Sequence, residues 1–388
     1  MGSVGDNPQA RARTEHVRMP APALLVLRQL ARGLLILVMA ASVGVLQEPL
    51  VDAAPVPQRP ASGPELEAMA ERAASLLREH QTGDGFWLTS YTNGSYYEAP
   101  RQEMNTYLTS MLVDMLSPIA RQRGLDDAME HARRHLAAQI ESNGLVRFHG
   151  APDEPKVGGC VITPDADDTA LVWRIAGPGP GDPRQQLMLG ELARYRDARG
   201  FYLTWLAPPD EFLCIDTTTP NQADIGIQMH VYLMLRELDP PAAQDLCTAL
   251  QGASSDEALW VYFGRSPLVP YLRSAELQQL GCPLPLPEER LARATEDQEI
   301  WSDAARRLVD TMASPPDANA QREIRDLLAR IGSEDFAQLR LSPPLIYHQA
   351  LGDVDVRADG RRFYWSEDFA YALWLRLYEA AGINIGQS

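Results

Sequence analysis

The sequence predicts a single all-α domain over residues 61–388, with its helices in two layers. Strand-like alternation of apolar and polar residues is scarce in this region, whereas helical periodicity recurs along it. Amphipathic segments take turns with segments that are apolar on nearly every side. The amphipathic segments suit an outer layer, and the apolar segments suit an inner layer that is covered by it.

The expected helices follow one another at short intervals. They cover residues 64–77, 103–116, 125–139, 163–174, 185–196, 221–238, 256–263, 268–280, 299–312, 318–331 and 366–381. Of these, 103–116, 221–238 and 366–381 begin with polar residues and continue as apolar runs, which is the pattern expected of inner helices.

Composition limits the classes of function. The chain has 388 residues, of which 45% are hydrophobic, and this is enough for one large core or two smaller ones. It carries 35 basic and 52 acidic residues, a formal net charge of −17, so nucleic acid is not an expected partner. The four cysteines, Cys160, Cys214, Cys247 and Cys282, form no C-x-x-C motif, and their spacing leaves their pairing open.

Residues 1–60 are predicted to lie outside the folded core. Arginines that include Arg28 and Arg32 precede an uncharged apolar run over residues 33–46, and a Pro- and Ala-rich linker follows. This run is short for a membrane span and fits a signal peptide that is cleaved after Ala53. An uncleaved anchor that includes both arginines is the other interpretation. We therefore expect either export or membrane association.

The stretch TPDADDTALVWR, which begins at Thr163, places Asp165, Asp167 and Asp168 at the expected first turn of a helix. Thr163 is the expected N-cap, and Pro164 suits the first helical position. Crowded carboxylates in a dry pocket cannot all ionise, so one of them should keep its proton to unusually high pH and could act as a Brønsted acid. A solvated acidic turn would look the same in the sequence.

A second pattern ends the first expected helix. Its members are a basic–small pair, an apolar residue and the sequence Q-x3-G-x-W, namely Arg72, Ala73, Leu77, Gln81, Gly85 and Trp87. Gln81 can bond backbone at the helix end, Gly85 permits a turn, and Trp87 can cover the helix below. Weaker echoes at Gln139 and Gly200 suggest an internal repeat.

Together the two patterns resemble class II terpene cyclases of the squalene-hopene and copalyl diphosphate synthase type. PDADDTA resembles the D-x-D-D acid motif of that family, and the segment that ends at Trp87 resembles its QW repeat, although the family usually has an aromatic residue where Leu77 stands. The resemblance implies that Asp167 is the acid that protonates a terminal alkene, with Asp165 and Asp168 as its supports. It also implies a single (α/α)6 toroid whose inner helices run parallel, so that their N-termini share one mouth.

The polar starts of the inner helices would meet at this mouth. Besides the three aspartates they supply Glu103, Asn105, Thr106, Asn221, Gln222, Asp224, Ser366, Glu367 and Asp368. The candidate substrate pocket consists of His230, Trp173, Tyr107, Asn221 and Trp374. Aromatic faces can stabilise a carbocation by roughly 0.5 to 2 kcal/mol each, although aromatic residues at helical spacing are usually core. His230 or His149 could bond the acid cluster and later restore its proton.

The implied reaction is the protonation-initiated cyclisation of a linear isoprenoid, such as a C15 or C20 prenyl diphosphate. No cofactor is required, and the three acids indicate a proton donor rather than a metal site. Mg²⁺ would enter only with a diphosphate, for which Arg101, Arg147 and Lys156 are candidate partners. Members of the family usually combine two barrels, whereas this chain has room for one. A partner domain, a homodimer partner or the membrane is therefore expected to complete the cavity.

Two other functions fit the same residues. A non-catalytic barrel that binds an apolar ligand or a partner protein would use the aspartates only to cap a helix, and solvated aspartates with ordinary titration would identify it. A carbohydrate-active (α/α)6 enzyme would need a second acid, such as Glu103 or Asp368, roughly 5 to 9.5 Å away across an open aromatic-lined groove.

Overall fold

The computed structural model describes residues 61–92, 99–215, 220–264, 266–286, 298–348 and 363–382. The predicted leader or anchor lies outside these residues. None of the helices in the described ranges combines the length and the apolar character that crossing a membrane requires.

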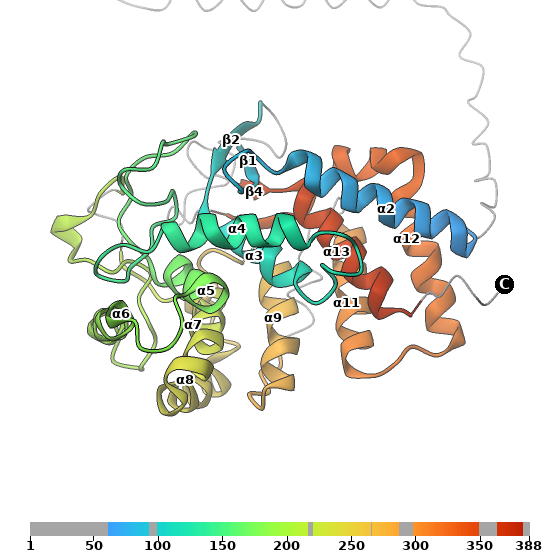
Figure 1. The fold of residues 1–388 in the computed structure, drawn as a ribbon. Coiled ribbons are helices and arrows are strands. Elements are labelled where there is room, and N and C mark those ends of the chain that lie inside the picture. Colours follow the sequence, from blue (N-terminus) through green and yellow to red (C-terminus); the bar gives the residue numbers. More distant parts are fainter. Residues whose placement is uncertain are drawn as a thin grey trace, which may run out of the picture. The chain divides into compact units, whose positions relative to one another are not determined.

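Six of the described helices form a closed inner ring. They are α3 (Thr106–Leu116), α5 (Ala166–Ala176), α7 (Ile225–Leu238), α9 (Leu268–Gln279), α11 (Glu299–Ala313) and α13 (Glu367–Ala380). Each packs against the next in this order, and α13 packs against α3, which closes the ring (Figure 1). The last inner helix of the chain therefore lies beside the first.

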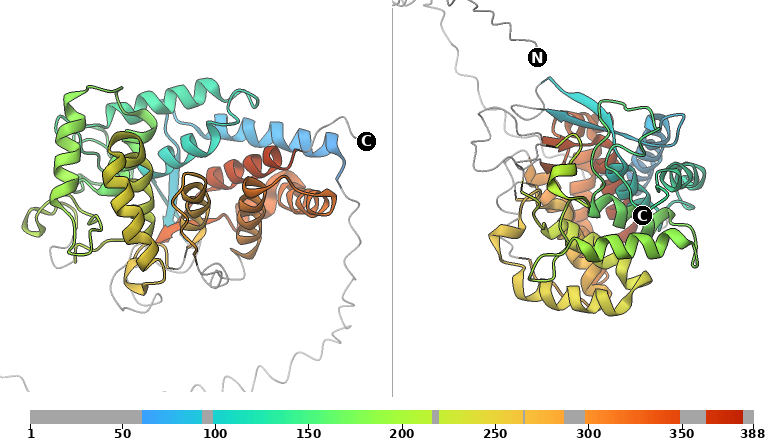
Figure 2. Two further views of the ribbon diagram at one scale, coloured as in Figure 1. Left: turned by 90° about the horizontal axis from the view of Figure 1, so that it is seen from below. Right: turned by 90° about the vertical axis from the view of Figure 1, so that its left-hand side faces the viewer.

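The outer layer is formed by helices that follow or precede an inner one. Its described members are α2 (Gly63–His80), α4 (Asp126–Ala138), α6 (Pro183–Arg194), α8 (Pro240–Ala253) and α12 (Ala318–Leu341), seen from two further sides in Figure 2. Helix α6 buries only Met188 and Leu192, whereas every residue of α7 from Ile225 to Leu235 is buried. The predicted two-layer (α/α)6 fold is confirmed.

A small antiparallel sheet was not predicted. Its strands are β1 (Leu88–Thr92), β2 (Arg101–Met104), β3 (Leu345–His348) and β4 (Phe363–Trp365), in the order β2-β1-β4-β3. Strands β2 and β4 directly precede α3 and α13, so the sheet lies at the N-terminal ends of these inner helices (Figure 1). Strands of three to five residues are too short to show a period of two in the sequence.

Two helix assignments also differ from the prediction. The expected helix over residues 256–263 is only a 3₁₀ turn, Glu257–Leu259. Helix α8 was not expected. Pro240 and Pro241 begin it, and the side chain of Asp239 caps it by accepting the N–H of Ala242. Proline is tolerated here because the first helical N–H groups have no partner within the helix.

The end of α2 is joined to α4 by Gln81. Its amide nitrogen donates to the carbonyl oxygen of Gly85 at 3.0 Å and to that of Ala128 at 2.8 Å. The indole N–H of Trp87 donates to the carbonyl oxygen of Leu77 at 2.8 Å. Gly85 has a φ of +95°, and an added Cβ would lie 2.9 Å from His131. The expected turn, amide bond and covering indole are therefore all present.

Two disulfides use all four cysteines. Cys160 pairs with Cys214 and Cys247 with Cys282, across Cα distances of 6.5 and 5.8 Å. The first joins the segment that leads into α5 to the segment after the 3₁₀ turn Pro209–Glu211, and the second joins α8 to the segment that follows α9. The structure thus settles the pairing that the sequence left open.

We expect Gln81→Ala to lower the free energy of unfolding by about 1 to 3 kcal/mol, because it removes the two hydrogen bonds that the Gln81 amide donates to Gly85 and Ala128. Chemical denaturation would measure the loss. Gln102→Ala, on an exposed position of β2, is the control and should change little. Equal effects of the two substitutions would contradict this role for Gln81.

Candidate active site

A cavity of about 450 Å³ lies at the N-terminal ends of α3, α5 and α7. Its volume is within the range of ligand pockets, roughly 300 to 1,000 Å³. The three acids of the sequence motif line it together with seven aromatic residues, Tyr107, Phe148, Trp205, Tyr262, Phe263, Tyr347 and Tyr364. A row of carboxyl groups therefore faces a largely aromatic wall.

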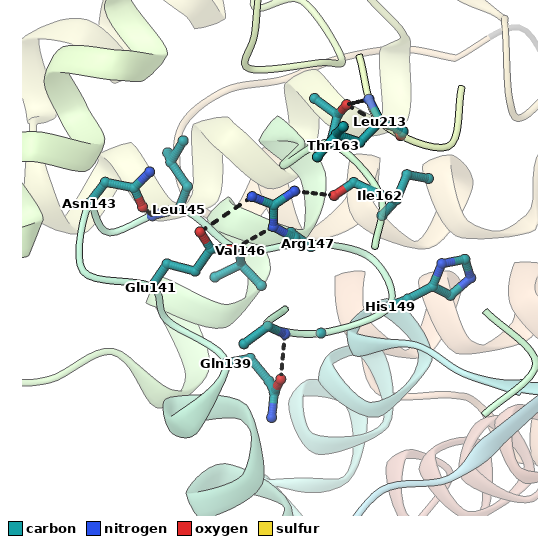
Figure 3. Close-up of polar contacts among 12 residues, drawn as sticks. Gln139, Glu141, Asn143, Leu145, Val146, Arg147, His149, Ile162, Thr163 and Leu213 are labelled. Carbon is teal, nitrogen blue, oxygen red and sulfur yellow. Dashed lines mark hydrogen bonds and ion pairs between the residues drawn. The ribbon is translucent and has the colours of Figure 1, made fainter. Parts of the chain in front are cut away.

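The acid helix starts two residues later than predicted. Asp165, not Thr163, is the N-cap, and its carboxylate accepts the backbone N–H of Asp168 at 2.8 Å. Thr163 is unavailable because it pairs with Leu213 through its backbone N–H at 3.1 Å and its hydroxyl group at 2.7 Å (Figure 3). This places Asp167 and Asp168 in the first turn of α5 and leaves Pro164 outside the helix.

Each acid is held by a different neighbour. The Oδ1 atom of Asp167 contacts Nδ1 of His230 on α7. The Oδ1 atom of Asp168 accepts the hydroxyl proton of Thr106 at the start of α3. Asp165 and Asp168 are 3% and 2% exposed, whereas 14% of the Asp167 side chain is accessible, on the cavity side. Asp167 is therefore the acid with the most open access to a ligand.

Burial sets the protonation of the cluster. It raises the pKa of Asp167 to about 7, against the opposing effect of the Arg273 charge. Burial and the neighbouring Asp167 raise the pKa of Asp168 to about 7 as well, and the pKa of Asp165 lies well above its ordinary value. Burial, followed by the charge of Arg273, holds the pKa of His230 well below its usual range. Asp167 therefore keeps its own proton up to about pH 7, while the imidazole of His230 is neutral.

The unexpected sheet supplies two stacked rings of the aromatic wall. Tyr347 of β3 stacks on Tyr364 of β4 with ring centroids 4.2 Å apart. Tyr107 of α3 meets Tyr347 edge-on at 5.1 Å and His230 at 5.9 Å. Phe148 contacts Tyr347 at 5.9 Å. This chain of rings leads from the pair formed by Asp167 and His230, called the acid pair below, along the cavity. The sequence offered no sign of it, because the strands that carry two of its rings are too short to be predicted.

Of the predicted pocket residues, the structure brings Tyr107 and His230 to the acids and places three others outside the cavity wall. The indole N–H groups of Trp173 and Trp374 donate to the carbonyl oxygens of Gly144 and Leu328, at 2.6 and 2.9 Å, within the core. Asn221 instead bonds the backbone of Trp205 at 2.9 and 2.8 Å, so it holds a wall residue in place.

Other polar candidates have partners of their own. His149 lines the cavity, but its Nε2 lies 3.3 Å from Oε2 of Glu103. The carboxylate of Asp368 lies 2.7 Å from Nδ1 of His80. Neither Glu103 nor Asp368 is among the residues that line the described cavity.

Two of the candidate phosphate partners are engaged in structural contacts. Arg147 bonds Glu141 and the carbonyl oxygen of Ile162, as Figure 3 shows. The ammonium group of Lys156 is surrounded by the carbonyl groups of residues 149–151. Arg101 is exposed on β2. In the described part of the chain, no three His, Cys, Asp or Glu side chains come together in a way that could hold a metal ion.

Comparison with solved structures finds the same fold in known proteins. A variant of the type II terpene cyclase MstE from Scytonema, in complex with its substrate geranylgeranyl dihydroxybenzoate, superposes with a TM-score of 0.53 at 14% identity over 83% of this chain and 99% of that chain. The complex with the product merosterolic acid A gives 0.52 at 13% identity and the same coverage. A protein from Actinoplanes gives 0.50 at 14% identity, over 82% and 99% of the two chains. No protein-family model and no curated protein matches the sequence. At these identities the likeness shows a terpene cyclase-like helical fold.

We expect Asp167→Asn to stabilise the protein increasingly as the pH rises from 4 to 8. The folded protein holds the Asp167 proton with a pKa of about 7 instead of 3.8, so the stability gained from this group is complete below 3.8 and lost as the pH passes 7. Asparagine stays neutral and avoids this loss, which amounts to about 1.4 kcal/mol per pKa unit. Thermal unfolding across this pH range would measure the difference.

Asp127→Asn is the matched control. Asp127 occupies the second position of α4, as Asp167 does in α5, but it is exposed. A pH-dependent gain of the same size in both variants would contradict the shifted pKa of Asp167.

Proposed function

We propose that this domain is a class II terpene cyclase in which Asp167 starts the cyclisation of a linear isoprenoid by protonating an alkene. The observation that carries the proposal is the state of Asp167, a carboxyl group that faces an aromatic cavity with 14% of its side chain accessible and a pKa raised to about 7. The likeness of the fold to MstE supports this assignment.

Alkene protonation requires an acidic proton that faces the substrate, walls that stabilise a cation without attacking it, and limited access of water, and the cavity offers all three. Asp167 bonds His230 through Oδ1, so Oδ2 can carry the proton toward the substrate. When the proton leaves, the alkene electron pair forms a C–H bond, a tertiary carbocation results, and Asp167 becomes a carboxylate. Stacked and edge-on rings stabilise positive charge without attacking it, by roughly 0.5 to 2 kcal/mol each. Burial of the site limits access of water to the cation.

The substrate that fits this proposal is a linear isoprenoid with a C15 or C20 chain. MstE binds a geranylgeranyl dihydroxybenzoate, which supports a chain of this class. The protonation step takes its proton from a carboxyl group and calls for no cofactor. Mg²⁺ would enter only as the partner of a diphosphate headgroup.

The alternative functions are less consistent with the site. A barrel that only binds a ligand was expected to have solvated aspartates, yet Asp165 and Asp168 are buried, only 14% of the Asp167 side chain is accessible, and the pKa values of all three are raised. A carbohydrate-active enzyme was expected to use Glu103 or Asp368 as a second acid. Glu103 contacts His149 and Asp368 contacts His80, away from the cavity surface.

We further propose that the domain is exported or held on the outer side of a membrane by its N-terminal segment. The two disulfides support this location, because such bonds persist in oxidising compartments.

The match with MstE extends over 99% of that chain, which favours a cavity completed by one barrel over one that needs a second domain.

The test is turnover of geranylgeranyl dihydroxybenzoate, farnesyl and geranylgeranyl diphosphates and squalene by the full-length protein, with products identified by mass spectrometry. We expect a cyclised product whose rate of formation is highest below pH 7 and falls as Asp167 loses its proton. Asp167→Asn should lower the rate by roughly 10² to 10⁴, the usual contribution of a general acid.

Asp127→Asn should retain activity, since it changes the same residue type at the same helical position on the surface. The cyclase assignment would fail if the folded wild-type protein converted none of these substrates. The role of Asp167 would fail if Asp167→Asn kept wild-type activity.

A further inference from the structure

A partly buried network of four charged residues ties α3, α5 and α9 together. Arg174 of α5 lies 3.0 Å from Asp114 of α3 and also contacts Glu276 of α9. Arg273 of α9 lies 2.7 Å from Glu276 and also contacts Asp114. The two arginines and two carboxylates balance each other, so the network as a whole is neutral.

Arg273 differs from Arg174 in its surroundings. Its residue is 7% exposed, and Nη2 lies 3.0 Å from the sulfur of Met111 on α3. Met111 is one helical turn from Tyr107, whose ring contacts His230. The Nε–H group of Arg273 is buried without a hydrogen-bond acceptor in the described structure. Arg273 is therefore the part of the network that is linked, through Met111 and Tyr107, to His230.

His230 has one nitrogen committed to the acid and one without a partner. Its Nδ1 contacts Asp167, while Nε2 is buried and has no hydrogen-bond partner among the described residues. A guanidinium group only donates hydrogen bonds and never loses its charge, so a nearby Arg273 disfavours a second proton on the imidazole. A proton on Nε2 would be buried without an acceptor. A proton on Nδ1 is donated to Asp167.

We propose, building on the cyclase function above, that Arg273 is a positioning residue for the acid. Its fixed charge keeps His230 neutral with the proton on Nδ1, and it stabilises the carboxylate that Asp167 becomes. The Nδ1–H group then occupies Oδ1 of Asp167, so the acidic proton resides on Oδ2, which can face the substrate. A charge that is in place before the proton leaves stabilises the developing anion without reorganisation.

Of the two arginines in the network, Arg273 is the one whose charge acts on both Asp167 and His230. The titratable groups that surround the acid pair are Asp165 and Asp168 on α5, Tyr107 and Asp114 on α3, Asp224 on α7, Arg273 and Glu276 on α9, Arg174 on α5, and Tyr262. Both arginines lower the pKa of His230, but of the two only Arg273 also lowers that of Asp167. Loss of Arg273 should therefore weaken the acid, and loss of Arg174 should not.

Two matched double variants test this difference. Arg273→Gln with Glu276→Gln, and Arg174→Gln with Glu276→Gln, each remove one arginine and the same carboxylate, so both networks stay neutral. The first readout is the ¹⁵N NMR signature of the His230 imidazole between pH 5 and 8, assigned by comparison with His230→Gln. The second is the pH dependence of turnover.

We expect the wild-type protein and the Arg174 double variant to show neutral His230 with the proton on Nδ1. In the Arg273 double variant His230 should become protonated or change tautomer within this range. Maximal turnover should fall about tenfold, which corresponds to one unit in the pKa of Asp167, and the pH at half-maximal rate should move upward. Arg273→Lys keeps the charge and should preserve the His230 signature even if the double variants fold poorly.

The proposal is overturned if wild-type His230 is protonated or carries its proton on Nε2, if both double variants change equally, or if Arg273→Lys loses the wild-type signature. The NMR readout needs no substrate, so it tests Arg273 even if no compound in the panel is converted. Turnover of a substrate with equal behaviour of the two double variants would reject Arg273 alone and leave the cyclase assignment intact.

Discussion

The crowding of three carboxyl groups, two of them buried and the third only 14% accessible, at the start of α5 is the constraint on which the rest of the site depends. A carboxylate without water must be bonded, paired with a cation or protonated. The structure uses a different solution for each acid: Asp165 caps the helix, Asp168 accepts a hydrogen bond from the hydroxyl group of Thr106, and Asp167 is held by Nδ1 of His230. Because Thr106 and His230 belong to α3 and α7, these solutions exist only when the inner helices stand side by side in the ring.

The small sheet gives this acid site an aromatic surface. It carries Tyr347 and Tyr364, which stack on each other and meet Tyr107 of α3. The disulfide between Cys160 and Cys214 joins two other segments that line the cavity. The helices therefore position the acid, while strands and loops shape the space into which its proton is delivered. This division explains how a common helical ring can serve a specific reaction.

The sequence predicted the layered helices and the acid cluster because both rest on local patterns, namely helical periodicity and three aspartates within four residues. It failed where distant segments decide the outcome. Thr163 has the residue type of an N-cap, but its hydroxyl group accepts the backbone N–H of Leu213 instead of capping the helix. The segments of β3 and β4 become strands only because they pair with each other and because β4 pairs with β1. Trp173 and Trp374 were expected in the pocket because they lie on inner helices, but their indole N–H groups face the core. Arg273 gave no signal, since an arginine within an amphipathic segment is ordinarily exposed.

The most direct test of the whole account is the titration of the Asp167 carboxyl group itself. Infrared difference spectra of the wild-type protein minus Asp167→Asn, recorded from pH 3 to 9, would follow the C=O stretch of the protonated acid. The account predicts that this band persists through mildly acidic pH and disappears near pH 7. A carboxyl group that loses its proton close to its ordinary value of 3.8 would contradict it, because a site with an ionised Asp167 at neutral pH has no proton to give.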